Sequence, residues 1–278
     1  MVESGVPTVA VIGTCRVHDT LREVQSLGLI QIENGGLNSF VHTLPEILLR
    51  LEVMSRKSIY LQDIVDIQVG TRSGVKLRPE ESFELTEVDI VVIEISSLKA
   101  IFYHEHPLQF NEVNRYLCTP NGDFGIKLRE EINLAFKNKT NEIKIPNLPY
   151  PESLPQKYRQ IISGLSPMLM NEEEINSYLE KIILFVNDIP IIFVNHINIE
   201  GHNGGKISSR NKLCQIISNY CNINSLPLFE PASLFKIHTK EQLLAKDGTD
   251  LAHYAKHALE IVGMEQYKKI FESLSAPI

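Results

Sequence analysis

Short runs that are apolar on both faces are the feature that most constrains what this sequence can fold into. They cover residues 7–14, 88–95 and 189–194, and the clearest of them reads Asp89-Ile90-Val91-Val92-Ile93-Glu94-Ile95. A strand with one solvent-exposed face alternates apolar and polar residues, whereas a strand buried on both faces is apolar throughout. These runs therefore predict strands in the interior of a parallel sheet.

The segments between these runs have the spacing of helices. Helices are predicted over residues 16–27, 43–55, 127–137, 172–187, 208–220 and 251–274, and shorter strands over 29–32 and 226–230. Strands that alternate with helices predict an α/β fold, a doubly wound parallel sheet flanked by helices in a flavodoxin-like three-layer sandwich. We expect one domain, residues 1–278, with an insertion at about 138–170, where five prolines and little periodicity indicate a segment draped over the surface.

Composition and charge exclude several classes of partner. The formal net charge is -7 and no long basic cluster occurs, so neither nucleic acid nor an anionic membrane is an expected partner. No apolar run reaches the roughly 18 residues of a bilayer span, and no secretion signal is visible, so we expect a cytoplasmic protein. The cysteines are expected to be free thiols, and His104 and His106 lack an identifiable third ligand, so no metal site is expected.

Polar residues follow three of the predicted strands at the point where each strand ends. They are Gly13-Thr14-Cys15, Ser96-Ser97 and Asn195-His196. In an open α/β sheet, ligands bind at the carboxyl ends of the strands. A fourth segment, near the C-terminus, places Asp250 three residues before His253 at a predicted helix start. We therefore expect these four segments to form one site.

A thiol at a helix N-terminus suggests nucleophilic chemistry. The helix dipole and the neighbouring Arg16 are expected to lower the pKa of Cys15 below the free value of about 8.5. His253 can accept the thiol proton, and Asp250 can orient the imidazole. The simpler interpretations are that Cys15 is a buried apolar residue and that Asp250 is only a helix N-cap.

Other residues, Arg16 among them, are candidates for stabilising an oxyanion or binding the substrate. The Asn195 side chain and backbone amides near Cys15 and Ser96 are expected to stabilise a developing oxyanion, with His196 as an alternative to Asn195. Lys206, in the glycine-rich segment 201–206, or Arg210 is expected to contact an anionic donor.

The order of these segments resembles the SGNH (GDSL-like) hydrolase superfamily. In that family a Gly-Asp-Ser motif follows the first strand, an Asn follows a later strand, and Asp-x-x-His lies near the C-terminus. Gly13-Thr14-Cys15 stands where Gly-Asp-Ser belongs, Asn195 takes the Asn position, and Asp250-Leu251-Ala252-His253 supplies the last motif. The family's middle-strand Gly is absent, and Ser96 or Ser97 lies in that region.

Cysteine at the nucleophile position is similar to the WcbI-like branch of that superfamily. The resemblance implies acyl transfer, from acyl-coenzyme A or another thioester, or hydrolysis of an ester or thioester. It implies no permanently bound cofactor and a small-molecule or carrier-bound acyl substrate. The alternative is a non-catalytic binding or scaffolding module in which Cys15 is buried and inert. A dinucleotide-binding protein is disfavoured because the first strand lacks Gly-x-Gly-x-x-Gly.

Overall fold

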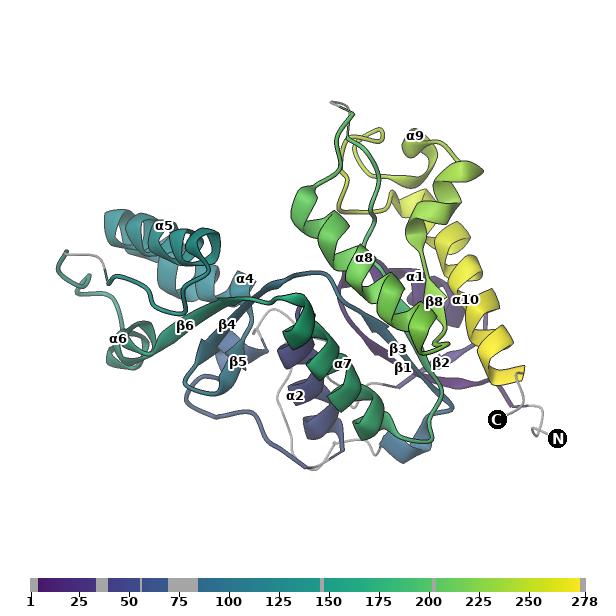
Figure 1. Ribbon diagram of the computed structural model, residues 1–278, viewed down its shortest axis with the longest axis horizontal. Coiled ribbons are helices and arrows are strands. Elements are labelled where there is room, and N and C mark those ends of the chain that lie inside the picture. Colours follow the sequence, from purple (N-terminus) through teal and green to yellow (C-terminus); the bar gives the residue numbers. More distant parts are fainter. Residues whose placement is uncertain are drawn as a thin grey trace.

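A five-stranded parallel sheet forms the centre of the protein. The computed structural model describes residues 5–33, 40–55, 57–69, 85–145, 148–201 and 204–275. The strand order is β2-β1-β3-β7-β8, and all neighbours are parallel (Figure 1). The strands are β1 (Thr8–Ile12), β2 (Gln31–Ile32), β3 (Ile90–Glu94), β7 (Ile191–Val194) and β8 (Leu228–Phe229). Counted within the sheet, this is the flavodoxin-like order 2-1-3-4-5, so the predicted doubly wound sheet is confirmed.

Helices cover both faces of this sheet. They are α1 (Cys15–Ser26), α2 (Leu44–Met54), α7 (Glu172–Val186), α8 (Ser208–Ile223) and α10 (Leu259–Ser275). Four of the six predicted helices therefore exist with ends close to those expected, a fifth, at 127–137, lies inside α5 (Gly122–Asn138), and the sixth, at 251–274, corresponds to the shorter α10. Shorter turns of helix are α3 (Val65–Gln68), η2 (Leu85–Glu87), η5 (Pro231–Lys236), α9 (Lys240–Leu243) and η6 (Lys256–Ala258).

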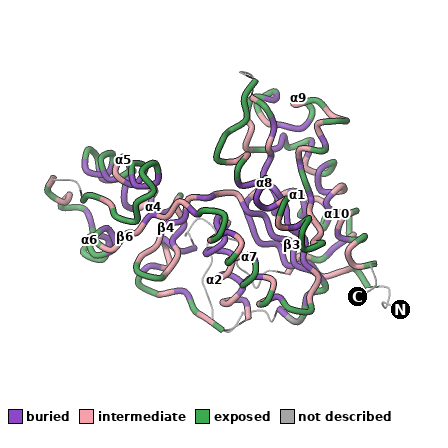
Figure 2. Tube along the Cα trace, viewed as in Figure 1, coloured by how far each residue is buried: buried purple, intermediate pink, exposed green. Residues whose placement is uncertain are grey.

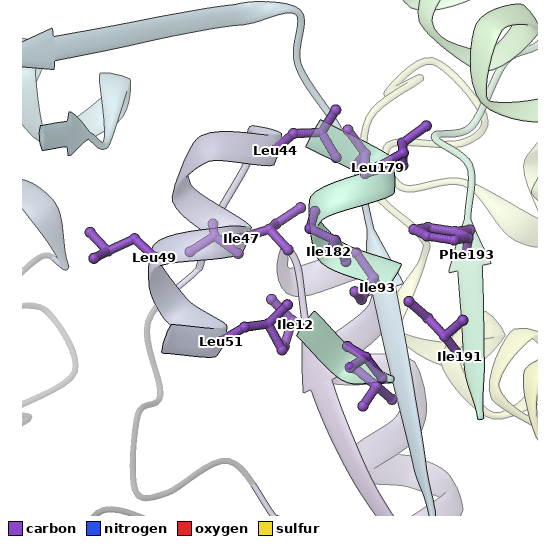
Figure 3. Close-up of a cluster of buried hydrophobic side chains, with 14 of the residues drawn as sticks. Ile12, Leu44, Ile47, Leu49, Leu51, Ile93, Leu179, Ile182, Ile191 and Phe193 are labelled. Carbon is purple, nitrogen blue, oxygen red and sulfur yellow. The ribbon is translucent and has the colours of Figure 1, made fainter. Parts of the chain in front are cut away.

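Alternate side chains of each central strand point into one of two separate cores. Ile12, Ile93 and Phe193 pack against α2 and α7, with Leu44, Ile47 and other residues of these helices in contact (Figure 3). The intervening residues, such as Val11, Val92 and Ile192, pack on the opposite face with α1 and α10. Burial on both faces is the reason that these strands are continuous in apolar residues. Figure 2 shows the sheet as buried chain between helices with exposed outer surfaces.

A second sheet departs from the predicted architecture. Strands β4 (Lys99–Tyr103), β5 (His106–Leu108) and β6 (Leu165–Leu169) form an antiparallel sheet in the order β5-β4-β6. It packs with α5, α6 (Gln156–Ser163), α4 (Phe110–Val113), and the turns η3 (Asn114–Cys118) and η4 (Thr119–Asn121). This part, the antiparallel lobe, has its own buried cluster and lies at one end of the molecule (Figure 1).

Part of the predicted insertion at about 138–170 has regular structure that the sequence analysis did not predict. Helix α6 and strand β6 occupy that part, while residues 146–147 lie outside the described chain. Pro167 lies in β6 and Pro107 in β5, and both are edge strands of the sheet. Proline lacks an N–H for a ladder bond and is tolerated only at such edges, so a proline-rich sequence can still contain a strand. Whether the chain is one domain, as expected, stays a prediction.

The predicted helix over 251–274 begins later than expected. Helix α10 starts at Leu259, and the residues before it form a turn that is closed by an antiparallel bridge between Leu244 and Tyr254. Lys246, Asp247 and Gly248 have positive φ, which no right-handed helix contains. Asp250 and His253 therefore lie on this turn, residues 244–254, and not at a helix start. In the part of the chain that the structure describes, no helix has the length and hydropathy required to cross a bilayer.

Candidate functional site

Cys15 lies where β1 ends and α1 begins. Thr14 is the N-cap of α1, its hydroxyl accepting from the Arg16 N–H, and Cys15 is the first residue of the helix. The Cys15 side chain is partly exposed, whereas Cys118, Cys214 and Cys221 are buried. Of the four thiols, Cys15 is thus the most accessible to a reagent or substrate.

The expectation that the pKa of Cys15 is lowered is wrong. Partial burial raises the pKa of the Cys15 thiol and outweighs the attraction of Arg16, while Asp19 and Glu94 raise it further. A helix N-terminus and one cation do not compensate for the loss of water and two nearby carboxylates. At neutral pH the thiol is protonated, so nucleophilic use of Cys15 requires a base.

A buried carboxylate, which sequence reasoning missed, fixes the residues on both sides of Cys15. Glu94 is the last residue of β3 and only 1% exposed. One of its oxygens accepts from the backbone N–H of Thr14 at 3.0 Å and from the Thr14 hydroxyl, and the other pairs with Arg16 Nε at 2.5 Å. The sequence signal that could have revealed Glu94 is an acidic residue at the end of an otherwise apolar strand. A buried charge needs a partner, so such a residue indicates a buried ion pair or hydrogen bonds.

Asp250 and His253 are hydrogen-bonded to each other on the turn 244–254. His253 Nδ1 lies 3.1 Å from Asp250 Oδ2 and 3.2 Å from Oδ1. Asp250 Oδ1 also accepts from the backbone N–H of Ala252 at 2.9 Å. Burial raises the pKa of Asp250, but the bonds from Ala252 and His253 prevail, so the pKa lies below its usual value. The carboxylate is thus ionised at neutral pH, and His253, with an exposed side chain, has Nε2 left for another partner.

Asp19 connects the thiol with the histidine electrostatically. It lies one helical turn after Cys15 and raises the pKa of that thiol, behind the larger effect of burial. Burial raises the pKa of Asp19 itself, and Arg22 and, more weakly, His253 oppose this shift. Both Cys15 and His253 thus lie within electrostatic range of the same carboxylate.

Two arginines hold the backbone between Asp250 and His253. Arg16 Nη1 donates to the Ala252 carbonyl at 3.1 Å, and Arg210 Nη1 donates to the Leu251 carbonyl at 2.6 Å. Arg210 Nη1 also donates to the Ile197 carbonyl at 2.9 Å. The structure therefore gives Arg210 a partner in the protein, where the sequence had suggested an anionic donor.

The oxyanion role of Ser96 stays a prediction, and the structure shows its polar groups bonded within the protein. The backbone N–H groups of Ser96 and Ser97 both donate to the His42 carbonyl at 3.0 Å, so neither is available to a substrate. The Ser96 hydroxyl lies 3.0 Å from His42 Nδ1, and Asn111 Nδ2 lies 3.1 Å from His42 Nε2. Burial, with Arg16, lowers the pKa of His42 to about 4, so this histidine is neutral. Sequence reasoning did not find His42, which follows a segment outside the described residues.

The oxyanion role of Asn195 likewise stays a prediction, and the structure shows its amide bonded within the protein. Its Nδ2 donates to the Ser218 hydroxyl at 2.9 Å and to the Cys214 carbonyl at 3.4 Å, both on α8. The amide hydrogens that would bind an oxyanion are therefore used inside the protein. The backbone N–H of Cys15 is hydrogen-bonded to its own thiol, which lowers the pKa of the thiol by less than burial raises it.

The two remaining predicted residues have different environments. His196 is buried, its Nδ1 lies 3.2 Å from the Ile197 carbonyl, and burial with Arg16 and Arg210 lowers its pKa to about 2. It is therefore neutral, and its role as an alternative to Asn195 stays a prediction. Lys206 is exposed in the segment before α8, and its contact with a donor stays a prediction. Among the described residues, no three His, Cys, Asp or Glu side chains form a group that could hold a metal ion.

Solved structures with a similar chain path include two esterases. A lipase/acylhydrolase from Enterococcus faecalis has a TM-score of 0.41 and 10% identity, with 95% of each chain covered. A catalytic mutant of an acetylxylan esterase from Geobacillus stearothermophilus has a TM-score of 0.42 and 10% identity, with 100% of this chain and 98% of that chain covered.

Sequence comparison gives a more specific result. The chain is 24% identical over 262 residues to the Vi polysaccharide biosynthesis protein TviD of Salmonella typhi. That alignment covers 91% of this chain and 30% of TviD, so the chain spans about a third of its relative's length. The profile of the TviD N-terminal domain matches residues 7–269, which include every site residue described above. The chain therefore belongs to the TviD N-terminal domain family.

Proposed function

We propose that this chain is an acyl-transfer enzyme in which Cys15 is the nucleophile, His253 the base and Asp250 the group that orients His253. The observation that carries this proposal is the Asp250–His253 hydrogen bond of 3.1 Å on a turn that is bonded to Arg16, the residue next to Cys15. A carboxylate on Nδ1 fixes the tautomer in which Nε2 can accept a proton.

The reaction would proceed in two balanced halves. The Cys15 sulfur attacks the carbonyl carbon of the donor as His253 Nε2 takes the thiol proton, and the backbone N–H of Cys15 donates to the oxyanion. The bond to the leaving group breaks, His253 returns the proton to that group, and the acyl group remains on sulfur. An acceptor hydroxyl or water then attacks the thioester and gives its proton to His253; the bond from the acyl carbon to sulfur breaks, and the sulfur takes that proton from His253 to restore the thiol.

The raised pKa of Cys15 supports this assignment of roles. A thiol with a lowered pKa would be ionised without help, whereas a protonated thiol needs a base during attack. His253 is the described histidine hydrogen-bonded to a carboxylate on the turn near Cys15. His18, His42 and His196 are buried and have pKa values lowered to about 3, 4 and 2, so they are poor proton acceptors.

We propose acyl-coenzyme A or another thioester as donor, because exchange between two sulfur centres is close to balanced in energy. Lys206 is the proposed contact for an anionic part of the donor. For the acceptor we propose a polysaccharide hydroxyl, on the strength of the printed role of TviD in polysaccharide biosynthesis. A cytoplasmic location is proposed as well, in keeping with four free thiols.

Intact-mass analysis tests the proposal. The protein is incubated with a panel of acyl-coenzyme A thioesters and with p-nitrophenyl acetate, and the mass of the protein is followed in time. We expect an acyl adduct on Cys15 in the native protein, none in Cys15→Ala, and an undiminished adduct in the matched control Cys118→Ala, which removes a buried thiol.

In His253→Ala, the fraction of protein that carries the acyl group depends on which step the base assists more. It should rise if deacylation is slowed more than acylation, and fall if acylation is slowed more. Turnover must be lost in either case. Turnover of p-nitrophenyl acetate by Cys15→Ala at the wild-type rate would overturn the proposal. Resistance of Cys15 to iodoacetamide until the protein is denatured would favour the alternative, a binding or scaffolding module with an inert thiol.

A further inference from the structure

We propose that Arg16, held by Glu94, is a positioning residue that sets the distance between the thiol of Cys15 and the imidazole of His253. This inference rests on the proposed function and names a part of its machinery. Neither residue would touch the substrate. Each acts through the backbone segments that carry the reacting side chains.

The first step of the argument is the way that Glu94 holds the start of α1. Its two oxygens bind Thr14 and Arg16, the residues immediately before and after Cys15. Glu94 and Arg16 are 1% and 9% exposed, so the ion pair of 2.5 Å is shielded from water. The nucleophile is thus fixed on both sides by one carboxylate, which stands on the neighbouring strand β3.

The second step is the contact from Arg16 to the turn 244–254. The same guanidinium that pairs with Glu94 through Nε donates through Nη1 to the carbonyl of Ala252, the residue before His253. Arg210, on α8, donates to the carbonyl of Leu251. Both residues between Asp250 and His253 are therefore held by an arginine. The planar guanidinium of Arg16 can contact Glu94 and the Ala252 carbonyl at a fixed angle, which a lysine ammonium cannot do.

The third step is that a buried ion pair such as Arg16–Glu94 is expected to contribute little to the free energy of unfolding. A buried ion pair is often no more stabilising than apolar residues of the same volume, and its best-attested use is to specify one arrangement. The turn 244–254 has three successive positive φ values, at Lys246, Asp247 and Gly248, and needs tertiary contacts to hold its shape. A misplacement of reacting groups by about 1 Å can lower a rate by about a hundredfold.

The test compares Arg16→Lys with Arg159→Lys, a matched control. Arg159 also donates to two loop carbonyls, those of Leu154 and Pro151, but in the antiparallel lobe. With p-nitrophenyl acetate as probe, we expect Arg16→Lys to lower kcat by roughly 10- to 100-fold with KM changed by less than about threefold. Arg159→Lys should leave both constants unchanged. Glu94→Gln, which keeps the shape and removes the charge, should also lower kcat.

A second readout separates positioning from a general structural role. The rate of Cys15 alkylation by iodoacetamide is measured against pH for wild type, Arg16→Lys and His253→Ala. If Arg16 positions His253, the profile of Arg16→Lys should move toward that of His253→Ala, because base assistance is lost. If Arg16→Lys does not fold, Arg210→Lys removes the second contact to the same turn and should lower kcat in the same sense.

The outcomes distinguish the two proposals. Wild-type kcat and an unchanged alkylation profile in Arg16→Lys and Glu94→Gln, together with an inactive Cys15→Ala, would overturn the positioning role and leave the proposed function intact. Turnover in Cys15→Ala would overturn the proposed function itself. A loss of kcat in Arg16→Lys that is matched by Arg159→Lys would show a general structural effect and would also overturn the positioning role.

Discussion

At the scale of single residues, the charge state of Cys15 depends on groups of its own helix. After burial and Arg16, the largest influence on its pKa is Asp19, one turn further along α1, and this carboxylate raises the pKa. Asp19→Asn should therefore lower the pKa of Cys15 and speed its alkylation by iodoacetamide at pH 8, on the order of twofold for a partly screened charge pair.

Glu23→Gln is the matched control for this change. Glu23 lies on the same helix and one turn beyond Asp19, yet it is not among the groups that act on the thiol. Its alkylation rate should equal that of wild type. If Asp19→Asn is alkylated no faster than wild type and Glu23→Gln, the electrostatic account of this thiol is contradicted.

The residue types of the candidate site could be predicted from the sequence, but their contacts could not. Cys15, Asp250 and His253 lie at strand ends or on a turn, where polar residues after apolar runs indicate function. The direction of the Asn195 amide depends on Ser218 and Glu230, which only the folded chain brings beside it. The same holds for Glu94, whose partners Thr14 and Arg16 are about eighty residues away in sequence.

At the scale of secondary-structure elements, α1 carries Cys15, the proposed nucleophile, and packs against α10. Gly263 of α10 lies against α1, where an added Cβ would come within 2.3 Å of the Thr20 carbonyl oxygen and 2.9 Å of Val24 Cγ2. The Thr20 hydroxyl also bonds Gln266 of α10 at 2.6 Å. Gly263→Ala should therefore separate the helices, destabilise the protein by about 1–3 kcal/mol and slow acyl transfer.

Gly125→Ala provides the comparison in the antiparallel lobe. A Cβ on Gly125 would come within 1.8 Å of the Cys118 carbonyl oxygen, so this change should also destabilise the protein. It should not alter the reactivity of Cys15, because α5 belongs to the antiparallel lobe at one end of the molecule, whereas α1 lies against the parallel sheet (Figure 1). Urea unfolding and Cys15 alkylation measured on both variants check this pair of expectations. Equal effects on alkylation would show that α10 has no special part in positioning the thiol.

The elements that the sequence predicted well share one property. The parallel strands and their helices have a periodicity that follows directly from burial on two faces or on one stripe. The antiparallel lobe gave no such pattern, because two of its three strands, β5 and β6, are edge strands that contain proline. Its strand β6 pairs with a partner about sixty-six residues earlier, and such pairing is set by tertiary contacts.

At the scale of the whole molecule, buried neutral histidines make stability depend on pH. Burial lowers the pKa of His18, His42 and His196 to about 3, 4 and 2, while an unfolded histidine has a value of about 6.5. Below that value the unfolded chain binds protons that the folded chain does not. Stability is therefore fully present above pH 6.5 and is lost as pH falls, by about 1.4 kcal/mol per pH unit for each histidine.

Glu46 acts in the opposite direction over part of the same range. Burial raises its pKa to about 7, although bonds from Thr43 and His42 limit the shift. Between about pH 4.5 and pH 7 the folded state keeps a proton on Glu46 that the unfolded state releases, so this group alone makes stability rise as pH falls. On unfolding, the three histidines take up three protons and Glu46 releases one, so the unfolded state binds about two more protons than the folded state. Stability should therefore fall by about 3 kcal/mol per pH unit between pH 6 and pH 5.

Urea unfolding at pH 7.5, 6.5, 5.5 and 5.0 measures this slope. A fall of about 3 kcal/mol per unit is large against the 5–15 kcal/mol of a typical domain, so the protein should unfold in mild acid. His18→Gln removes a buried histidine that packs near Phe40. Whatever this change does to stability at pH 7.5, it should reduce the pH dependence of the free energy of unfolding by about 1.4 kcal/mol per pH unit, the contribution of one proton. A stability that stays constant from pH 7.5 to 5.0 would mean that these imidazoles reach water and take up protons in the folded state, and the neutral surroundings assigned to His42 and His196 beside the site would then be wrong.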